Sequence, residues 1–345
     1  MITPADGGRA DGSSVTLTTV TVALDLLGGD TGPEVVADAA LLVIDQQPGI
    51  DLILVGPAVP TAALINERGL SGRVRAVPSG SAVQMDEDPV RAVRSRPEVS
   101  VQVAAALVHT AQADACVSIG HTGASLAAAT LTLGRLPGVS RAAIAVVVPA
   151  TKHPVVLLDV GGTVDATPEL LAQFALTGSA FAAALGLADE PAVGLLTIGS
   201  EPGKGDALRR LTHEVLSDLP IRYIGPVEGD DVAVGGPAHV IVTDGFTGNV
   251  VLKALEGAAQ NTAERIAARY DNPEPALEVA RSFAIGTHVG AVLLGIDGVS
   301  VVGHAGSTAG EIAAYIALAA RSVRSGLVAR TSAKLSELTD QVVPR

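Results

Sequence analysis

Residues 239–257 read HVIVTDGFTGNVVLKALEG, and this stretch guides the interpretation of the whole chain. The apolar run Val240–Val242 is short enough for a buried strand. A glycine-rich loop follows from Asp244 to Asn249, and apolar residues then recur at helical spacing. A strand, a glycine loop and a helix in this order direct free backbone N–H groups and the positive end of a helix dipole at one place. The stretch therefore predicts a site for an anion.

Asp244 follows this predicted strand directly. An ionised carboxylate cannot serve as a ligand of phosphate, because like charges repel. We therefore expect Asp244 to orient a neighbouring group or to handle a proton.

The order of strand, glycine loop and helix recurs along the chain. The first strand is predicted at Val20–Leu24, and Gly28 and Gly29 separate it from a helix that begins at Pro33, a residue that suits the first helical position. Strands alternating with helices favour a parallel sheet covered on both faces. Ligands of such sheets gather at the carboxyl ends of the strands. Five glycine-rich loops are expected there, at Gly28, Gly120, Gly161, Gly203 and Gly245.

Composition narrows the classes of function. The 345 residues are 48% hydrophobic, which is ample for a large core, and only 2% aromatic, which argues against base-stacking platforms. The net charge of −13 argues against a general binder of nucleic acid. The single cysteine, Cys116, fits a reducing compartment and a packed core position. No apolar run reaches the ~18–20 residues of a membrane span, and no signal peptide is indicated, so a cytoplasmic protein is expected.

Several familiar motifs are absent or incomplete. Lys204 lies between Gly203 and Gly205, but the spacing does not match a phosphate-binding P-loop, so the lysine is either a point charge for phosphate or a solvated turn residue. His121 is either a site residue or a polar loop residue, and His304 is a weaker candidate of the same kind. The acidic run 86–88 precedes Pro89, where helix capping is favoured over a metal site. No zinc-type spacing and no dinucleotide fingerprint are present, and no metal or cofactor is predicted.

Seven segments together resemble the bacterial phosphate acyltransferase family. They are VALDLLGGD at 22–30, GHTGA at 120–124, RLPGVSR at 135–141, LLDVG at 157–161, GLLTIGSEPGKG at 194–205, VEG at 227–229 and TDGFTGNVVLK at 243–253. The resemblance runs in order from about residue 20 to 325. It implies a three-layer α/β/α fold with a mainly parallel sheet, similar to phosphotransacetylases and isopropylmalate dehydrogenases.

The resemblance also implies an activity. The family makes acyl phosphate from an acyl-carrier-protein thioester and inorganic phosphate for phospholipid synthesis, and its members are homodimers that associate with the membrane surface. We expect Lys204, Asp244, Asn249 and His121 to serve catalysis. The residues expected to bind substrate or phosphate are Asp25, Gly28, Gly29, Gly120, Thr122, Gly123, Gly203, Gly205, Gly245, Thr247 and Gly248.

The chain departs from the family at several places. The family usually has asparagine where His121 stands, and Ala-Asn where Gly162 and Thr163 stand. Further departures lie at 94–100, 288–291 and 304–307. Residues 258–286 are shorter than the family's helical hairpin and carry few large apolar side chains, so membrane association is expected to be weak or absent.

Three hypotheses remain open at this stage. The chain is a phosphate acyltransferase of lipid synthesis, a divergent relative acting on another acyl thioester, or a non-catalytic partner of acyl carrier protein. The expected organisation is a disordered extension at 1–19, one acyltransferase-like domain at 20–330 and a polar tail at 331–345.

Overall fold

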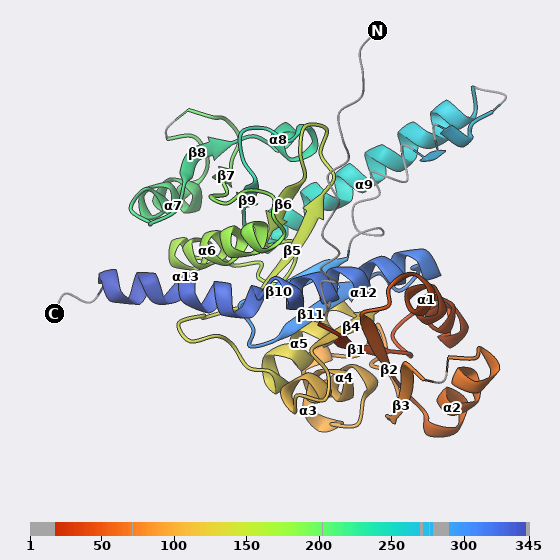
Figure 1. Ribbon diagram of the computed structural model, residues 1–345. Helices are drawn as coiled ribbons and strands as arrows, with labels where there is room; N and C mark the ends of the chain where they lie inside the picture. Colours follow the sequence, from red (N-terminus) through yellow and green to blue (C-terminus); the bar gives the residue numbers. More distant parts are fainter. Residues whose placement is uncertain are drawn as a thin grey trace, which may run out of the picture.

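The computed structural model describes residues 18–70, 72–201, 203–269, 272–275, 277–278 and 290–342. Nearly all of the expected extension and the departure at His288 and Val289 lie outside these residues. The described strands form one 11-stranded sheet in the order β3-β2-β1-β4-β11-β10-β5-β6-β9-β7-β8 (Figure 1). Their bounds are β1 Val20–Asp25, β2 Ile50–Gly56, β3 Val74–Pro78, β4 Ala115–Ile119, β5 Ala143–Val148, β6 Val155–Leu158, β7 Val193–Leu196, β8 Tyr223–Val227, β9 Val240–Val242, β10 Ala291–Leu294 and β11 Val299–Gly303.

Helices cover both faces of the sheet, so the expected three-layer α/β/α fold is confirmed (Figure 1). The helices are α1 Pro33–Gln46, α2 Ala58–Glu67, α3 Pro89–Ser95, α4 Ser100–His109, α5 Thr122–Thr132, α6 Pro168–Ala184, α7 Ala207–Ser217, α8 Gly229–Val234, α9 Gly245–Ala267, α12 Ala309–Arg324 and α13 Leu327–Val342. Side chains of α1, α6 and α12 join those of β1 and β2 in the largest apolar cluster.

The directions of the strands divide the sheet into two groups. Strands β3, β2, β1, β4 and β11 run parallel to one another, and so do β6, β9, β7 and β8. Between the groups, β10 and β5 pair antiparallel with each other, β10 pairs antiparallel with β11, and β5 with β6. Three reversals of direction leave the two parallel groups pointing in opposite senses.

This arrangement corrects the expectation that five glycine loops share one edge. The loops at Gly28 and Gly120 follow strands of one group, whereas those at Gly161, Gly203 and Gly245 follow strands of the other. Loops from both groups can therefore reach a common site only in the middle of the sheet, where the two groups of strands meet.

The start of α3 settles the role of the acidic run before it. The Asp88 carboxylate accepts a hydrogen bond from the Arg91 N–H at 2.7 Å and so caps the helix. Glu87 forms an ion pair with Arg96. The interpretation of this run as capping is therefore confirmed for Asp88.

The carboxyl-terminal residues correct the expectation of a polar tail from Thr331. They belong to α13, which contacts α6. Leu327, Thr331 and Leu335 are buried at a spacing of four residues, which places them on one face of a helix. The buried face of α13 is narrow and includes a threonine. For this reason the sequence of the segment shows no clear apolar pattern and was expected to be a polar tail.

Within the described part of the chain, no single helix is long and apolar enough to cross a membrane. One pair, α12 with the segment 327–336, passes the length and composition criteria together but is bent by 51°. Helix α12 contacts α1, β1, β4 and β11, so it serves as a covering helix of the sheet.

Candidate active site

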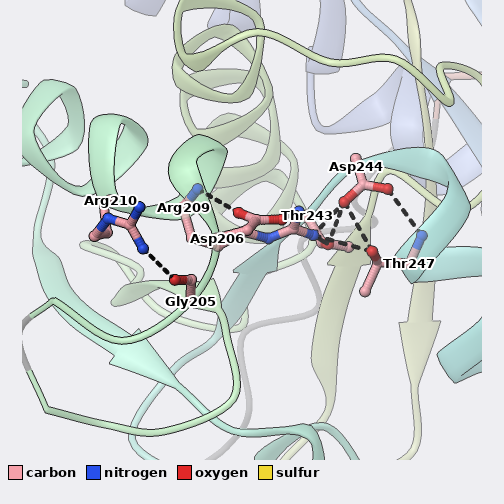
Figure 2. A network of polar contacts seen from close by, with 7 residues as sticks. All are labelled: Gly205, Asp206, Arg209, Arg210, Thr243, Asp244 and Thr247. Atoms are coloured by element: carbon pink, nitrogen blue, oxygen red, sulfur yellow. Dashed lines mark hydrogen bonds and ion pairs between the residues drawn. The ribbon is translucent and has the colours of Figure 1, made fainter.

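The loop at the start of α9 is held by a network of charged and hydroxyl groups (Figure 2). The Asp244 carboxylate accepts hydrogen bonds from the Thr247 N–H at 2.9 Å and the Thr247 hydroxyl at 2.8 Å. The Arg209 guanidinium of α7 forms an ion pair with Asp244 and donates to the hydroxyls of Thr243 and Thr247, at 3.1 and 3.0 Å. Asp244 therefore orients its own loop and joins it to α7.

The protonation state of Asp244 follows from these contacts. Burial favours a higher pKa for this carboxyl, but the Thr247 hydrogen bonds and the Arg209 charge outweigh it, so the pKa lies below its usual value. Asp244 is ionised near neutral pH and committed to Arg209, which makes it a poor proton acceptor.

The loop after β6 lies directly against the start of α9. The buried Asp159 carboxylate accepts hydrogen bonds from the N–H groups of Ile144, Gly162 and Thr163, at 2.9, 2.9 and 2.6 Å. Burial raises the pKa of Asp159, and these hydrogen bonds oppose the rise. A Cβ atom added at Gly248 would lie 1.9 Å from the Asp159 carbonyl oxygen. Glycine is therefore needed here for close packing of α9 against the loop.

The loops after β1 and β4 form a similar unit in the other group of strands. The buried Asp25 carboxylate accepts hydrogen bonds from the Leu27 N–H at 3.0 Å and the Ser118 hydroxyl at 2.9 Å, while burial raises its pKa. A Cβ atom at Gly28 would lie 1.8 Å from the Ile119 carbonyl oxygen, and one at Gly120 would lie 1.9 Å from the Gly28 carbonyl oxygen. Asp25 and these glycines thus hold the two loops together.

A cavity of about 200 Å³ lies where the two groups of strands meet. Loops and helix starts from both groups contribute to it, and apolar residues of the central strands form one wall. The lining residues are Thr122, Ile144, Val146, Val160, Gly161, Asn249, Leu252, Lys253, Ala291, Val302, Gly303 and His304. We call this space the junction cavity.

The junction cavity combines several features that suit an anion. Thr122 is the first residue of α5, whose N-terminus carries a partial positive charge. Asn249 donates a hydrogen bond to the Val160 carbonyl at 3.1 Å, which ties α9 to the loop after β6. The Lys253 ammonium lies 2.8 Å from Glu256 and 3.4 Å from His304 Nε2. Lys253 and His304 are the ionisable residues of this lining within the described part of the chain.

The sequence-predicted residues are thus distributed over more than one space. Thr122 and Asn249 line the junction cavity, and His121 immediately precedes α5 as its N-cap. Gly203 and Lys204 line a separate cavity of about 130 Å³ beside Arg210 and His213. Gly205 and Thr247 line a third, of about 390 Å³. The Lys204 ammonium lies 3.9 Å from Glu201 and its side chain is half exposed.

Two residues at the site were not expected from the sequence. Arg209 was not expected because its partners in the loop at Asp244 lie 34 to 38 residues away along the chain. Lys253 ends the motif at 243–253 and follows Asn249 by four residues, so the two share a helix face. That spacing is the signal by which Lys253 could have been found.

The fold of the chain is similar to that of phosphotransacylases of known structure. The phosphotransacetylase of Streptococcus pyogenes superposes with a TM-score of 0.60 at 18% identity, over 89% of this chain and 94% of that one. A branched-chain phosphotransacylase from Enterococcus faecalis V583 gives a TM-score of 0.59 at 16% identity, over 88% and 99%. At these identities the likeness concerns the fold.

Sequence relatives identify the family. A family described as "Fatty acid synthesis protein" matches residues 20–330. A phosphate acyltransferase of Desulfitobacterium hafniense (strain DSM 10664 / DCB-2) is 38% identical over 329 residues, covering 92% of this chain and 98% of that protein. Another, from Trichormus variabilis, is 40% identical over 323 residues, covering 89% and 93%. The chain belongs to the fatty acid synthesis protein family and is an acyltransferase, which confirms the expected family and enzyme class.

Proposed function

We propose that this chain transfers the acyl group of an acyl-carrier-protein thioester to inorganic phosphate and releases acyl phosphate and the carrier thiol. The observation that carries the proposal is the junction cavity, which joins an apolar wall to the start of α5, Asn249 and a lysine. The names of the relatives agree with transfer to phosphate. The carrier protein is proposed from the family resemblance of the sequence.

The chemistry requires that a phosphate oxygen reach the thioester carbonyl carbon. The N-terminus of α5 and the Lys253 charge favour a bound phosphate, since both are positive. The Asn249 side-chain amide is a donor suited to the oxyanion that develops on the carbonyl oxygen. Ile144, Val146 and Val302 offer the first carbons of the acyl chain an apolar wall. Bringing both reactants to near-attack distance in this space supplies much of the acceleration.

The remaining expected residues take supporting roles in this proposal. Gly28, Gly120, Gly245 and Gly248 allow the loops to approach closely. His121 occupies the N-cap position of α5, where its side chain makes no capping hydrogen bond. Lys204 lies outside the junction cavity, so we assign the phosphate to Lys253 and test Lys204 separately below.

Acyl phosphate formation tests the proposal directly. The purified full chain is incubated with palmitoyl-acyl-carrier protein, with and without phosphate. Transfer of phosphorus-32 from labelled phosphate into a lipid product measures the acyl phosphate, and a thiol reagent measures the released carrier. We expect both products only with phosphate. Thiol release without acyl phosphate would indicate thioester hydrolysis and contradict the proposal. No turnover with any acyl chain would also contradict it and would favour a non-catalytic carrier-binding role.

Asn249→Ala tests whether the junction cavity is the place of reaction. Removing an oxyanion donor typically lowers kcat by roughly 10²–10³-fold. The matched control is Asn261→Ala, an exposed asparagine farther along α9. We expect the control to keep the parent rate. Equal rates for the two variants would place the chemistry elsewhere.

The size of the junction cavity favours a second candidate that differs only in substrate. At about 200 Å³, the space suits the reacting groups better than a long acyl chain, because pockets for drug-sized ligands are typically ~300–1,000 Å³. A divergent enzyme for short acyl thioesters would prefer butyryl over palmitoyl donors. Comparing kcat/KM for chains of different length, on carrier protein and on coenzyme A, separates the two candidates.

The physical state of the protein completes the proposal. From the family resemblance we propose a homodimer, to be measured by light scattering coupled to gel filtration. Helix α9 extends away from the sheet, and most of its side chains beyond Leu255 are small or polar (Figure 1). Weak or absent vesicle binding is therefore proposed. Strong co-sedimentation with anionic vesicles would contradict it.

A further inference from the structure

Lys253 and His304 come from different halves of the molecule and meet at the junction cavity. Lys253 lies on α9, after the second group of strands, and His304 directly follows β11 in the first group. Their side-chain nitrogens are 3.4 Å apart. Glu256, one helical turn after Lys253, accepts from the ammonium at 2.8 Å. The contact therefore links the two walls of the cavity.

The contact is a hydrogen bond with only one form of the histidine ring. A lysine ammonium only donates hydrogen bonds, so His304 Nε2 must offer its lone pair. The ring is then neutral, with its proton on Nδ1. Burial and the Lys253 charge lower the pKa of His304, while Glu256 and Glu311 act in the opposite direction. These are the charged groups that influence the ring.

We propose that Lys253 and His304 act as a pair in which Lys253 holds the phosphate and His304 Nε2 accepts the proton of the attacking hydrogen phosphate. The inference rests on the proposed function and adds a base to it. When Lys253 turns to the phosphate, the Nε2 lone pair becomes free beside the same anion. Lys253 thus keeps His304 neutral before phosphate arrives. When phosphate binds, Lys253 releases the Nε2 lone pair of His304.

The step balances in atoms and charge. An oxygen of hydrogen phosphate forms a bond to the thioester carbonyl carbon, and its proton passes to His304 Nε2. The carbon–sulfur bond breaks as the carbonyl is restored, and sulfur leaves with the bonding electron pair. The histidinium then gives its proton to the thiolate. Hydrogen phosphate and thioester become acyl phosphate and thiol, and the histidine returns to its neutral form.

Other acids and bases near the cavity are already committed. Asp244 is bound to Arg209 and Thr247, and Asp159 accepts three well-formed backbone hydrogen bonds. Asp25 is buried against Ser118. His304 is the histidine that lines the cavity within the described residues. Glu256 pairs with Lys253 through Oε2, and its Oε1 is buried without a hydrogen-bond partner, but it is not part of the cavity lining. Among the described residues that line the cavity, His304 is the base that can accept the proton of the phosphate.

The pH dependence of kcat/KM for phosphate tests the role of His304. Loss of a general base typically costs roughly 10²–10⁴-fold, so His304→Gln should lose about 100-fold or more. The variant should also lose the decline of the parent rate that protonation of His304 causes at acid pH. Titration of phosphate itself affects all proteins alike, and His109→Gln, at an exposed histidine of α4, controls for the substitution. A His304→Gln profile that parallels the parent at all pH values would overturn the proposal.

Lys253 is tested through its effect on His304. Lys253→Met should raise KM for phosphate and move the acid decline to higher pH, because the ring loses the cation that disfavours its protonation. Lys253→Arg should restore the pH profile, and Lys152→Met, at an exposed lysine, should change neither. An unchanged acid decline in Lys253→Met would overturn the pairing.

A direct titration separates this inference from the proposed function. The His304 ring resonance is followed by nuclear magnetic resonance in the parent protein, Lys253→Met and Lys253→Arg without substrate. We expect the pH midpoint of the His304 titration to be higher in Lys253→Met than in the parent protein, and to be unchanged in Lys253→Arg. An unchanged midpoint in Lys253→Met would contradict the pairing. If the parent forms no acyl phosphate, the proposed function fails while this titration still decides the pairing. If the parent is active and His304→Gln matches it, only the inference fails.

Discussion

Arg209 shows how one side chain connects two functional loops. Its side chain is only 11% exposed, and the guanidinium contacts Asp206, Thr243, Asp244 and Thr247. Three of these partners belong to the loop that starts α9. The position of Asn249 and Lys253 in the junction cavity therefore depends on an arginine that lies outside it.

Arg209→Met should destabilise the protein. The change leaves the Asp244 carboxylate buried without its cation, a loss that costs about 3 kcal/mol at the low end for buried pairs. Chemical denaturation measures the free energy of unfolding. Arg210→Met is the matched control, because Arg210 is exposed and contacts only the Gly205 carbonyl among the described partners. A similar, small loss in both variants would show that the network contributes little.

Asp244→Asn should reveal a pH-dependent contribution to stability. The pKa of Asp244 is lower in the folded protein than in the unfolded chain, so its charge stabilises the fold above the unfolded pKa of about 4. That contribution disappears as the pH falls through the folded pKa. Asparagine still caps the helix, so the loss at pH 7 should reflect the ion pair, at about 2 kcal/mol. Unfolding measured from pH 7 to pH 3 should show the two proteins converging at acid pH, and a constant gap would exclude this origin.

At the scale of elements, most strands and helices were predictable because their patterns are strong. β1 is apolar and almost wholly buried, and α1 begins with proline as expected. β8 was missed because Gly225 and Pro226 interrupt its pattern. The reversed directions of β5 and β10 were missed because an apolar run does not encode the direction in which a strand pairs.

Gly248→Ala tests the close contact between α9 and the loop after β6. The new Cβ atom would lie 1.9 Å from the Asp159 carbonyl oxygen, so the helix must move. We expect a loss of about 3 kcal/mol in the free energy of unfolding, together with lower activity as Asn249 shifts. Gly257→Ala on the same helix meets no atom within 4 Å and should stabilise the protein by about 0.5–1 kcal/mol. Thermal denaturation measures the stability of both variants. Equal changes in stability for Gly248→Ala and Gly257→Ala would contradict the proposed contact.

At the scale of the whole molecule, the site depends on contacts between distant parts of the chain. Asp244 and Arg209 are 35 residues apart, and Lys253 and His304 are 51 apart. Sequence patterns located the glycine loops because each is local. They could not show which loops meet, since that depends on the order and direction of the strands. The sequence therefore led to Lys204, which lies in a local glycine motif, and did not single out Lys253, which meets His304 only through folding.

The two lysines give opposite predictions about where the reaction occurs. Lys204 lines a cavity beside α7, and its half-exposed side chain has Glu201 3.9 Å away, whereas Lys253 lines the junction cavity with His304. Lys204→Ala should therefore keep kcat/KM for phosphate within about threefold of the parent, because an exposed, weakly paired charge contributes little. Lys253→Met should lower it at least roughly tenfold, since one charged contact to a bound anion is worth about 1.5–3 kcal/mol. Steady-state kinetics with phosphate varied at saturating acyl-carrier protein measures both. The reverse order of effects would move the phosphate to the loop at Lys204 and the reaction centre toward α7.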